Sequence, residues 1–152
     1  MLRYDDGGLK NVWLVNGYEV KDTAYGKATA YHDVDGLARA ICLALTKKPG
    51  KLTGAEFRYL RQSGLMMSQV SLAKLMGVDT QSVARWEKTG QVPKYANKLV
   101  RVVYCAQAEG NLAIKRVVER INDVDRLLNQ KIILESSARG WKPRVEDVDL
   151  TL

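Results

Sequence analysis

The stretch from Ser68 to Glu87 limits what this chain can fold into more than any other, because it predicts two short helices joined by a tight turn. Ser68 is a preferred first cap of a helix, since its hydroxyl can accept a hydrogen bond from an otherwise unpaired amide. Apolar residues then recur at helical spacing at Leu72, Ala73 and Met76. Gly77 can take the left-handed conformation that ends many helices, and Asp79 is placed to cap a second helix.

The second of these helices is predicted to have one buried side and one polar side. Val83 and Trp86 would face inward, whereas the opposite face carries Thr80, Gln81, Ser82 and Arg85. Glutamine can pair bidentately with adenine, arginine with guanine, and serine or threonine with either base edges or phosphate. The pattern therefore predicts a helix-turn-helix whose second helix reads bases of double-stranded DNA.

The distribution of charge agrees with a nucleic-acid partner. The net charge is +7, and residues 51–110 carry nine basic and four acidic side chains. Residues 1–50 carry seven and six, and residues 111–152 carry eight and seven. The excess of positive charge therefore falls on the predicted helix-turn-helix segment, as expected for a surface that contacts phosphates.

Composition predicts a soluble, cytoplasmic protein that has no membrane partner. No run approaches the roughly 18 apolar residues of a membrane span, and the first residues lack an apolar signal segment. Cys42 and Cys105 lie far apart in helical patterns, so a disulfide framework is not expected. The single histidine, His32, has no companion at metal-ligand spacing. Because no nucleophile–base set or phosphate-binding glycine loop appears either, the sequence predicts no metal, no cofactor and no enzymatic activity.

Residues 1–50 are predicted to form a small β-plus-helix element. Asn16–Gly17 is a strong hairpin signal between strands at 12–15 and 18–21, and a further turn at 23–26 leads into a strand at 27–31. Asp33 or Asp35 can cap the following helix. Its predicted buried stripe comprises Val34, Leu37, Ala38, Ile41, Cys42 and Leu45. The lysine-containing linker at 46–51 is equally well interpreted as a phosphate-contacting arm or as a solvated connection.

Residues 51–110 are predicted to form a complete helical domain around the central pair of helices. Thr53 and Glu56 match the S/T-x-x-E capping box at the start of its first helix. Gly90 should end the second helix of the pair, and Pro93 fits the start of the next one. That last helix has a predicted apolar stripe at Ala96, Leu99, Val100, Val103 and Tyr104.

Residues 111–152 are predicted to begin with a long helix from Leu112 to Leu134. Its apolar stripe comprises Ile114, Val117, Val118, Ile121, Val124, Leu128 and Ile132. The repeat is near seven residues for about three heptads, so this helix is the best candidate for a dimer interface, with an ordinary helix packed on its own domain as the alternative. Residues 136–152 are interpreted as a tail.

The motif resembles the phage repressor/Cro-like (XRE) family of helix-turn-helix proteins. The matching residues are Ser68, Gln69, Leu72, Ala73, Met76, Gly77, Val78, Val83, Arg85, Trp86 and Glu87. The resemblance covers about 51–104 and is similar in detail to the DNA-binding half of MqsA-type antitoxins. Two departures are visible: the chain has no Cys-x-x-Cys zinc ligands, and it has one residue more than the family pattern between Arg61 and Ser68.

The predicted structure is mainly α, of the α+β class. It comprises the lambda-repressor-like helical domain that the resemblance implies, together with the small N-terminal β-hairpin/helix element and the long C-terminal helix that the residue patterns predict. The DNA-binding residues that the resemblance implies are Gln69, Thr80, Gln81, Ser82 and Arg85, and Lys88 is a further predicted DNA-binding residue. The resemblance also implies that Glu87 pairs inward with Arg61, which is a structural role.

The function expected from these features is sequence-specific transcriptional regulation. The protein would act as a repressor that binds a palindromic operator as a homodimer. The alternative is an antitoxin that binds a toxin protein and regulates its own operon. A small-molecule sensor, with the N-terminal β segment as its pocket, also stays open.

Overall fold

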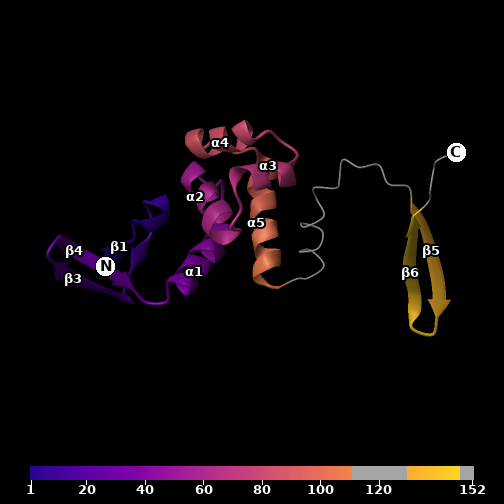
Figure 1. The fold of residues 1–152 in the computed structure, drawn as a ribbon, viewed down its shortest axis with the longest axis horizontal. Helices are drawn as coiled ribbons and strands as arrows, with labels where there is room; N and C mark the ends of the chain where they lie inside the picture. The colour runs from indigo at the N-terminus through magenta and orange to yellow at the C-terminus, as the bar shows by residue number, and fades with distance from the viewer. Residues whose placement is uncertain (111–129, 148–152) are drawn as a thin grey trace. The chain divides into compact units, whose positions relative to one another are not determined.

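The computed structural model describes residues 1–110 and 130–147, and the chain divides into two compact units at 1–121 and 122–152. The first unit contains β1 (Leu2–Arg3), η1 (Asp6–Gly8), β2 (Trp13–Leu14), β3 (Tyr18–Thr23), β4 (Gly26–Tyr31), α1 (Val34–Thr46), α2 (Gly54–Tyr59), η2 (Leu60–Gly64), α3 (Gln69–Met76), α4 (Thr80–Thr89) and α5 (Lys94–Ala108). The second contains β5 (Gln130–Ser137) and β6 (Gly140–Asp147). Figure 1 shows these elements in chain order. The predicted α+β class is confirmed.

The N-terminal strands form two separate pairs, and the predicted hairpin at Asn16–Gly17 is wrong. β2 pairs with β1, with Trp13 opposite Arg3, while β3 pairs with β4 around the turn at 23–26. The local turn signal is overridden because Tyr4, which follows β1, is buried and its ring lies edge-on to Tyr31, with the ring centroids 5.0 Å apart. The predicted turn at 23–26 and the strand that follows it are confirmed.

Helix α1 begins as predicted from its cap. Asp33 accepts a hydrogen bond from the Gly36 amide at 3.1 Å, although its backbone takes a left-handed φ of 46°. Ile41, Cys42 and Leu45 are buried, as the stripe predicts, whereas Val34 at the first position of the stripe is exposed. The predicted stripe is therefore wrong in its first residue, because the first turn of α1 extends beyond the core.

The capping box of α2 is confirmed, and it has an additional partner. The Glu56 amide donates to Thr53 Oγ1 at 3.1 Å, and the Thr53 amide donates to Glu56 Oε1 at 2.8 Å. Lys48 Nζ lies 2.6 Å from the same carboxylate oxygen, which ties the end of α1 to α2. The following η2 is a π-helical turn, closed by a 2.8 Å bond from the Leu65 amide to the Leu60 carbonyl. A π turn accommodates an additional residue within a helix.

The two short helices α3 and α4 begin and end where the sequence predicts. The Ser71 amide donates to Ser68 Oγ at 3.0 Å, and Gly77 and Gly90 end α3 and α4 with φ of 67° and 75°. Asp79 occupies the N-cap position of α4 without a side-chain capping bond. The buried core of the unit includes Tyr4, Leu9, Ile41, Leu45, Leu52, Phe57, Leu60, Leu72, Val83, Trp86, Ala96, Val100 and Tyr104. Residues from 1–50 and from the later helices therefore share one core.

The second unit corrects the predicted C-terminal helix and tail. Residues 130–134, the last part of the predicted helix, belong to β5, and residues 140–147 of the predicted tail form β6. The two strands pair antiparallel around a two-residue loop at 138–139. The rest of the predicted helix lies outside the described residues. The contiguous apolar run Ile132–Leu134 fits both a helical stripe and a strand, so periodicity alone could not separate them.

Candidate functional site

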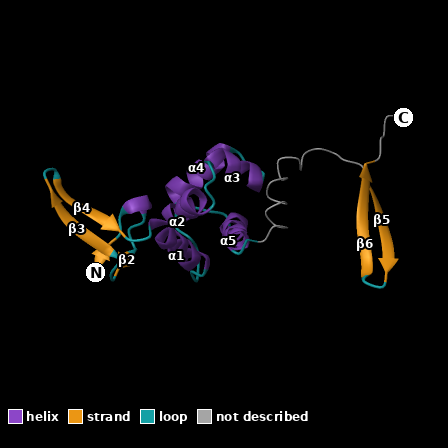
Figure 2. Cartoon of the chain, turned by 60° about the horizontal axis from the view of Figure 1, so that its bottom comes forward, coloured by secondary structure: helices purple, strands orange, loops and turns teal. Residues whose placement is uncertain are grey.

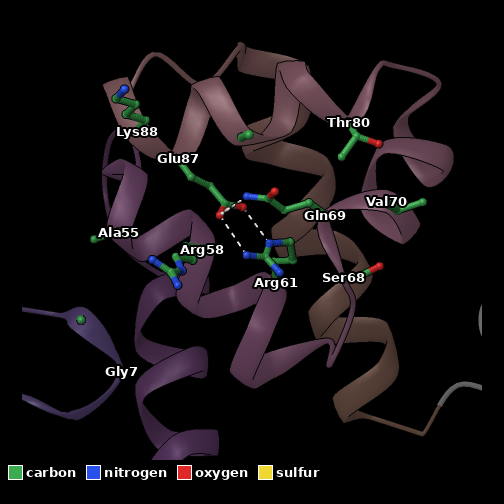
Figure 3. A pocket seen from close by; sticks show the side chains of 12 residues that line it. Gly7, Ala55, Arg58, Arg61, Ser68, Gln69, Val70, Thr80, Glu87 and Lys88 are labelled. Carbon is green, nitrogen blue, oxygen red and sulfur yellow. Dashed lines mark hydrogen bonds and ion pairs between the residues drawn. The ribbon is translucent and has the colours of Figure 1, made fainter.

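A polar groove of about 810 Å³ lies beside α4 on the helical part of the first unit. Figure 3 shows this groove at close range. It is lined by Gly7, Gly8, Ala55, Arg58, Arg61, Ser68, Gln69, Val70, Thr80, Ala84, Glu87 and Lys88. These residues come from η1, from α2 and η2, from the start of α3 and from one side of α4. The groove therefore lies where three helices of the core reach the surface.

A buried ion pair fixes the three helices around the groove. Arg61 Nε lies 2.7 Å from Glu87 Oε2 and Arg61 Nη2 lies 2.9 Å from Glu87 Oε1, as the dashed lines in Figure 3 show. Arg61 Nη1 also donates to the Met67 carbonyl at 2.9 Å, and Gln69 Nε2 donates to Glu87 Oε1 at 3.2 Å. The predicted inward pairing of these two charged residues is confirmed. The network joins η2, the loop before α3, the first residue of α3 and the last turn of α4.

Close packing of α2 against α4 adds a second restraint. A Cβ atom at Gly54 would collide with the backbone carbonyl of Glu87, so the first residue of α2 must be glycine for this approach. Trp86 is buried, and its ring lies edge-on to Phe57 and Tyr95 at centroid distances of 6.1 and 6.2 Å. The inner side of α4 is therefore fixed, and its outer side is presented in one orientation.

The structure divides the six predicted DNA-binding residues into two groups. Gln69, Thr80 and Lys88 line the groove. Gln81 and Arg85 are exposed on the side of α4 away from the buried Val83 and Trp86, and Ser82 is half-buried. Arg85 Nη2 lies 3.4 Å from Ser82 Oγ, one turn away. Gln69 is already engaged by the Glu87 carboxylate, so only part of its hydrogen-bonding capacity is open to a ligand.

Arg58 is the residue that the sequence did not single out. It is exposed, it lies in α2, and it lines the same groove as Lys88. Its position three residues before Arg61 places the two arginines on adjacent turns of one helical segment, and this spacing was the available signal. Arg61 pairs with Glu87 inside the protein, whereas Arg58 leaves its charge at the surface.

The surface of residues 51–110 keeps the positive charge that the sequence count indicates. Two of the four acidic residues, Glu56 and Glu87, are paired with Lys48 and Arg61 and have side chains only 2% and 5% exposed. The remaining acids, Asp79 and Glu109, are exposed. The exposed cations of this segment are Lys51, Arg58, Lys74, Arg85, Lys88, Lys94 and Lys98. Internal pairing removes both acids and cations from the surface, and the seven exposed cations outnumber the two exposed acids, so their charge is left to solvent or to an anionic ligand.

Burial and hydrogen bonding together set the ionisation of three groups in the core. Burial raises the pKa of the Cys42 thiol to about 11 and that of the Tyr59 hydroxyl to about 12. Burial alone would raise the pKa of Glu56, but hydrogen bonds from Lys48 and the Thr53 amide outweigh it and lower this pKa below 4.5. Cys42 is thus a protonated core residue at neutral pH, and Glu56 is a carboxylate.

Neither a metal-ligand cluster nor a membrane-spanning helix is found in the described part of the chain. Among residues 1–110 and 130–147, no three His, Cys, Asp or Glu side chains are grouped so that they could hold a metal ion. Within the same ranges, no helix has the length and apolar character needed to cross a membrane. Comparisons of the chain with protein-family models, with curated proteins and with solved structures found no match.

Proposed function

We propose that the protein is a sequence-specific DNA-binding transcriptional regulator. In this proposal α3, the Gly77 turn and α4 form a helix-turn-helix, and α4 is the recognition helix. The observation that carries the proposal is the fixed presentation of α4: its inner side is held by the Arg61–Glu87 pair and by Trp86, while Gln81, Arg85 and Lys88 are exposed. The exposed cations around it supply the attraction to phosphate.

The dimensions and chemistry of α4 suit the major groove. The helix has 10 residues, so its length is about 15 Å at the usual rise per residue. A major groove about 12 Å wide admits such a helix. Arg85 offers a bidentate contact to guanine and Gln81 one to adenine. The N-terminus of α3, with Ser68 and Gln69 at the groove, would lie against a phosphate, which helix N-termini favour.

The proposed mechanism is occupancy of an operator, with repression as its result. Proteins of this design read two half-sites about one helical turn apart, so the regulator is expected to act as a dimer on a palindrome. No ligand or enzymatic step is part of this mechanism.

The proposal is tested by comparing Arg85→Ala with the matched control Lys27→Ala, which removes one exposed cation from β4. We expect Arg85→Ala to weaken binding to a selected operator by about 5- to 150-fold, because a good bidentate base contact contributes about 1 to 3 kcal/mol. Fluorescence anisotropy with labelled duplexes measures this, and circular dichroism checks that both variants are folded. Equal operator affinities for the two folded variants would refute the assignment of α4.

A second candidate is an antitoxin that binds a toxin protein and regulates its own operon. The observation that favours it is the exposure of large apolar side chains in the N-terminal strands and turns, at Trp13, Val15, Val20 and Tyr25. Exposed apolar side chains that lie together are typical of a protein-binding site, and these four are the candidate contacts for a toxin. Co-expression with the product of the adjacent gene, followed by purification on a tag of this chain, tests it. A stoichiometric complex that Tyr25→Ser or Val20→Ser weakens is expected from the antitoxin function, and no complex would contradict it.

A further inference from the structure

The β5–β6 hairpin has one apolar face and one charged face. Strand register places Ile132 opposite Val145, Leu134 opposite Pro143 and Ser136 opposite Trp141. Directly opposed residues lie on the same face of a sheet, so these apolar side chains gather on one side. Ile132, Leu134, Trp141 and Val145 are 68%, 57%, 71% and 52% exposed. The other face carries Lys131, Glu135, Lys142, Arg144 and Glu146, together with the half-buried Ile133.

Two strands with such a face gain stability from a further element. An isolated two-stranded hairpin is marginally stable in water, and independent stability comes from further strands that share an apolar face or from a packed helix. The hairpin has two edges to which a strand could be added, the outer edge of β5 and the outer edge of β6 (Figure 2). These edges differ in their backbone hydrogen-bonding groups.

The outer edge of β6 is blocked by Pro143. Ser137 and Gly140 flank the two-residue loop, and such flanking residues form a hydrogen-bonded pair, after which bonded and non-bonded pairs alternate along the ladder. The pair of Leu134 and Pro143 is therefore a non-bonded one, whose backbone groups point outward. Proline has no N–H, so it interrupts the donors of the β6 edge. On β5, the outward groups of Ile132 and Leu134 include both donors and acceptors.

The sequence of β5 is complementary to itself in an antiparallel arrangement. If two copies of β5 pair around a two-fold axis at Ile133, Lys131 of each copy lies opposite Glu135 of the other. In the same register Ile132 lies opposite Leu134, and both are residues whose backbone groups point outward. Opposite charges and apolar pairs across strands both stabilise a sheet. The same axis places the two apolar faces on one side.

We propose that the outer edge of β5 is a self-association surface, through which two copies of this chain form a four-stranded sheet in the order β6–β5–β5–β6. The partner is a second copy of the chain, paired antiparallel around Ile133. This interface involves only the hairpin and does not depend on DNA binding. It places the dimer contact in a different element from the long helix that the sequence predicts.

The test uses the full-length chain and reverses the charges of the proposed interchain pair, Lys131 of one copy and Glu135 of the other. Wild type is expected to be mainly dimeric at about 100 µM and to dissociate on dilution, since small interfaces often give micromolar affinities. Lys131→Glu places two acidic side chains opposite each other at both ends of the pairing, and Glu135→Lys places two basic ones there. Each variant alone should dimerise about tenfold more weakly or worse. An equimolar mixture should restore the dimer, because at both ends an acidic side chain of one variant then faces a basic side chain of the other.

Sedimentation equilibrium measures the dimer in each sample, and Lys27→Glu in β4 is the matched charge control, which should dimerise like wild type. Restoration in the mixture separates the interchain contact from any weakening of the hairpin, since each variant carries the same intrachain change in both samples. A monomeric wild type, single variants as dimeric as wild type, or a mixture that stays monomeric while wild type dimerises would each overturn the proposal. A single DNA half-site is bound by one copy, so the affinity of the hairpin variants for it tests the proposed DNA binding separately from dimerisation.

Discussion

The buried pair of Arg61 and Glu87 gives the sharpest stability prediction. Their side chains are 8% and 5% exposed, and two N–O contacts of 2.7 and 2.9 Å join them. Glu87→Gln keeps the shape of the side chain but leaves the guanidinium without its counter-charge. Removing one partner of a buried pair costs about 3 to 5 kcal/mol. We expect the free energy of unfolding to fall by about that amount, a large share of the roughly 5 to 15 kcal/mol of a typical domain.

Urea denaturation followed by helical circular dichroism measures the change. The control is Glu19→Gln, which removes the same charge from a pair with Lys21 at 3.8 Å whose side chains are 75% and 70% exposed. Its expected effect is below about 0.5 kcal/mol. The double variant Arg61→Met with Glu87→Met should recover part of the loss, because no buried charge remains unpaired. A Glu87→Gln protein as stable as the control would refute the reasoning. So would a double variant that loses more free energy of unfolding than the single variants Arg61→Met and Glu87→Met lose together.

Three further predictions concern the contacts that hold the helices together. Gly54→Ala should lower the free energy of unfolding by about 1 to 3 kcal/mol, because its Cβ would collide with the Glu87 carbonyl; an unchanged urea midpoint would contradict this close approach. Arg101→Ala should lower the free energy of unfolding by about 1 to 3 kcal/mol, since its guanidinium donates to the backbone carbonyls of Lys48 and Gly50 at 2.7 and 2.5 Å. Amide exchange in 48–50 should become faster in this variant, and unchanged exchange would argue against the contact. The pKa of Glu56 is lowered from 4.5, so its contribution to stability is present above pH 4.5 and is lost as the pH falls through the folded-state pKa. Glu56→Gln should therefore make the free energy of unfolding fall less steeply on the acid side, and a fall as steep as in wild type would show that other groups control it.

The central helices could be predicted from sequence because their determinants are local. The Ser68 and Thr53 caps and the Gly77 and Gly90 ends all act within one turn of the chain, and each lies where the pattern places it. The charge pair between Arg61 and Glu87 spans 26 residues, and the family resemblance predicted it correctly.

The remaining errors have long-range causes. The Asn16–Gly17 signal is sound locally, but pairing of β2 with β1 and burial of Tyr4 decide the strand partners. Around Ile132 the apolar run satisfies both helical and strand periods, and pairing with β6 decides for a strand. Arg58 was missed because its place beside Lys88 in the groove depends on how α2 packs against α4, which no local pattern shows.

The measurement that tests the proposed function most directly is selection of bound DNA from a random duplex library by the full-length protein, with the mass of the complex determined alongside. We expect enrichment of a palindrome with half-sites about 10 base pairs apart, bound by two copies. Affinity for it should fall by about a thousandfold or more between about 50 and about 200 mM salt. A library that shows no enriched sequence after repeated rounds, with binding equal for all duplexes, would contradict the assignment of α4 as a recognition helix.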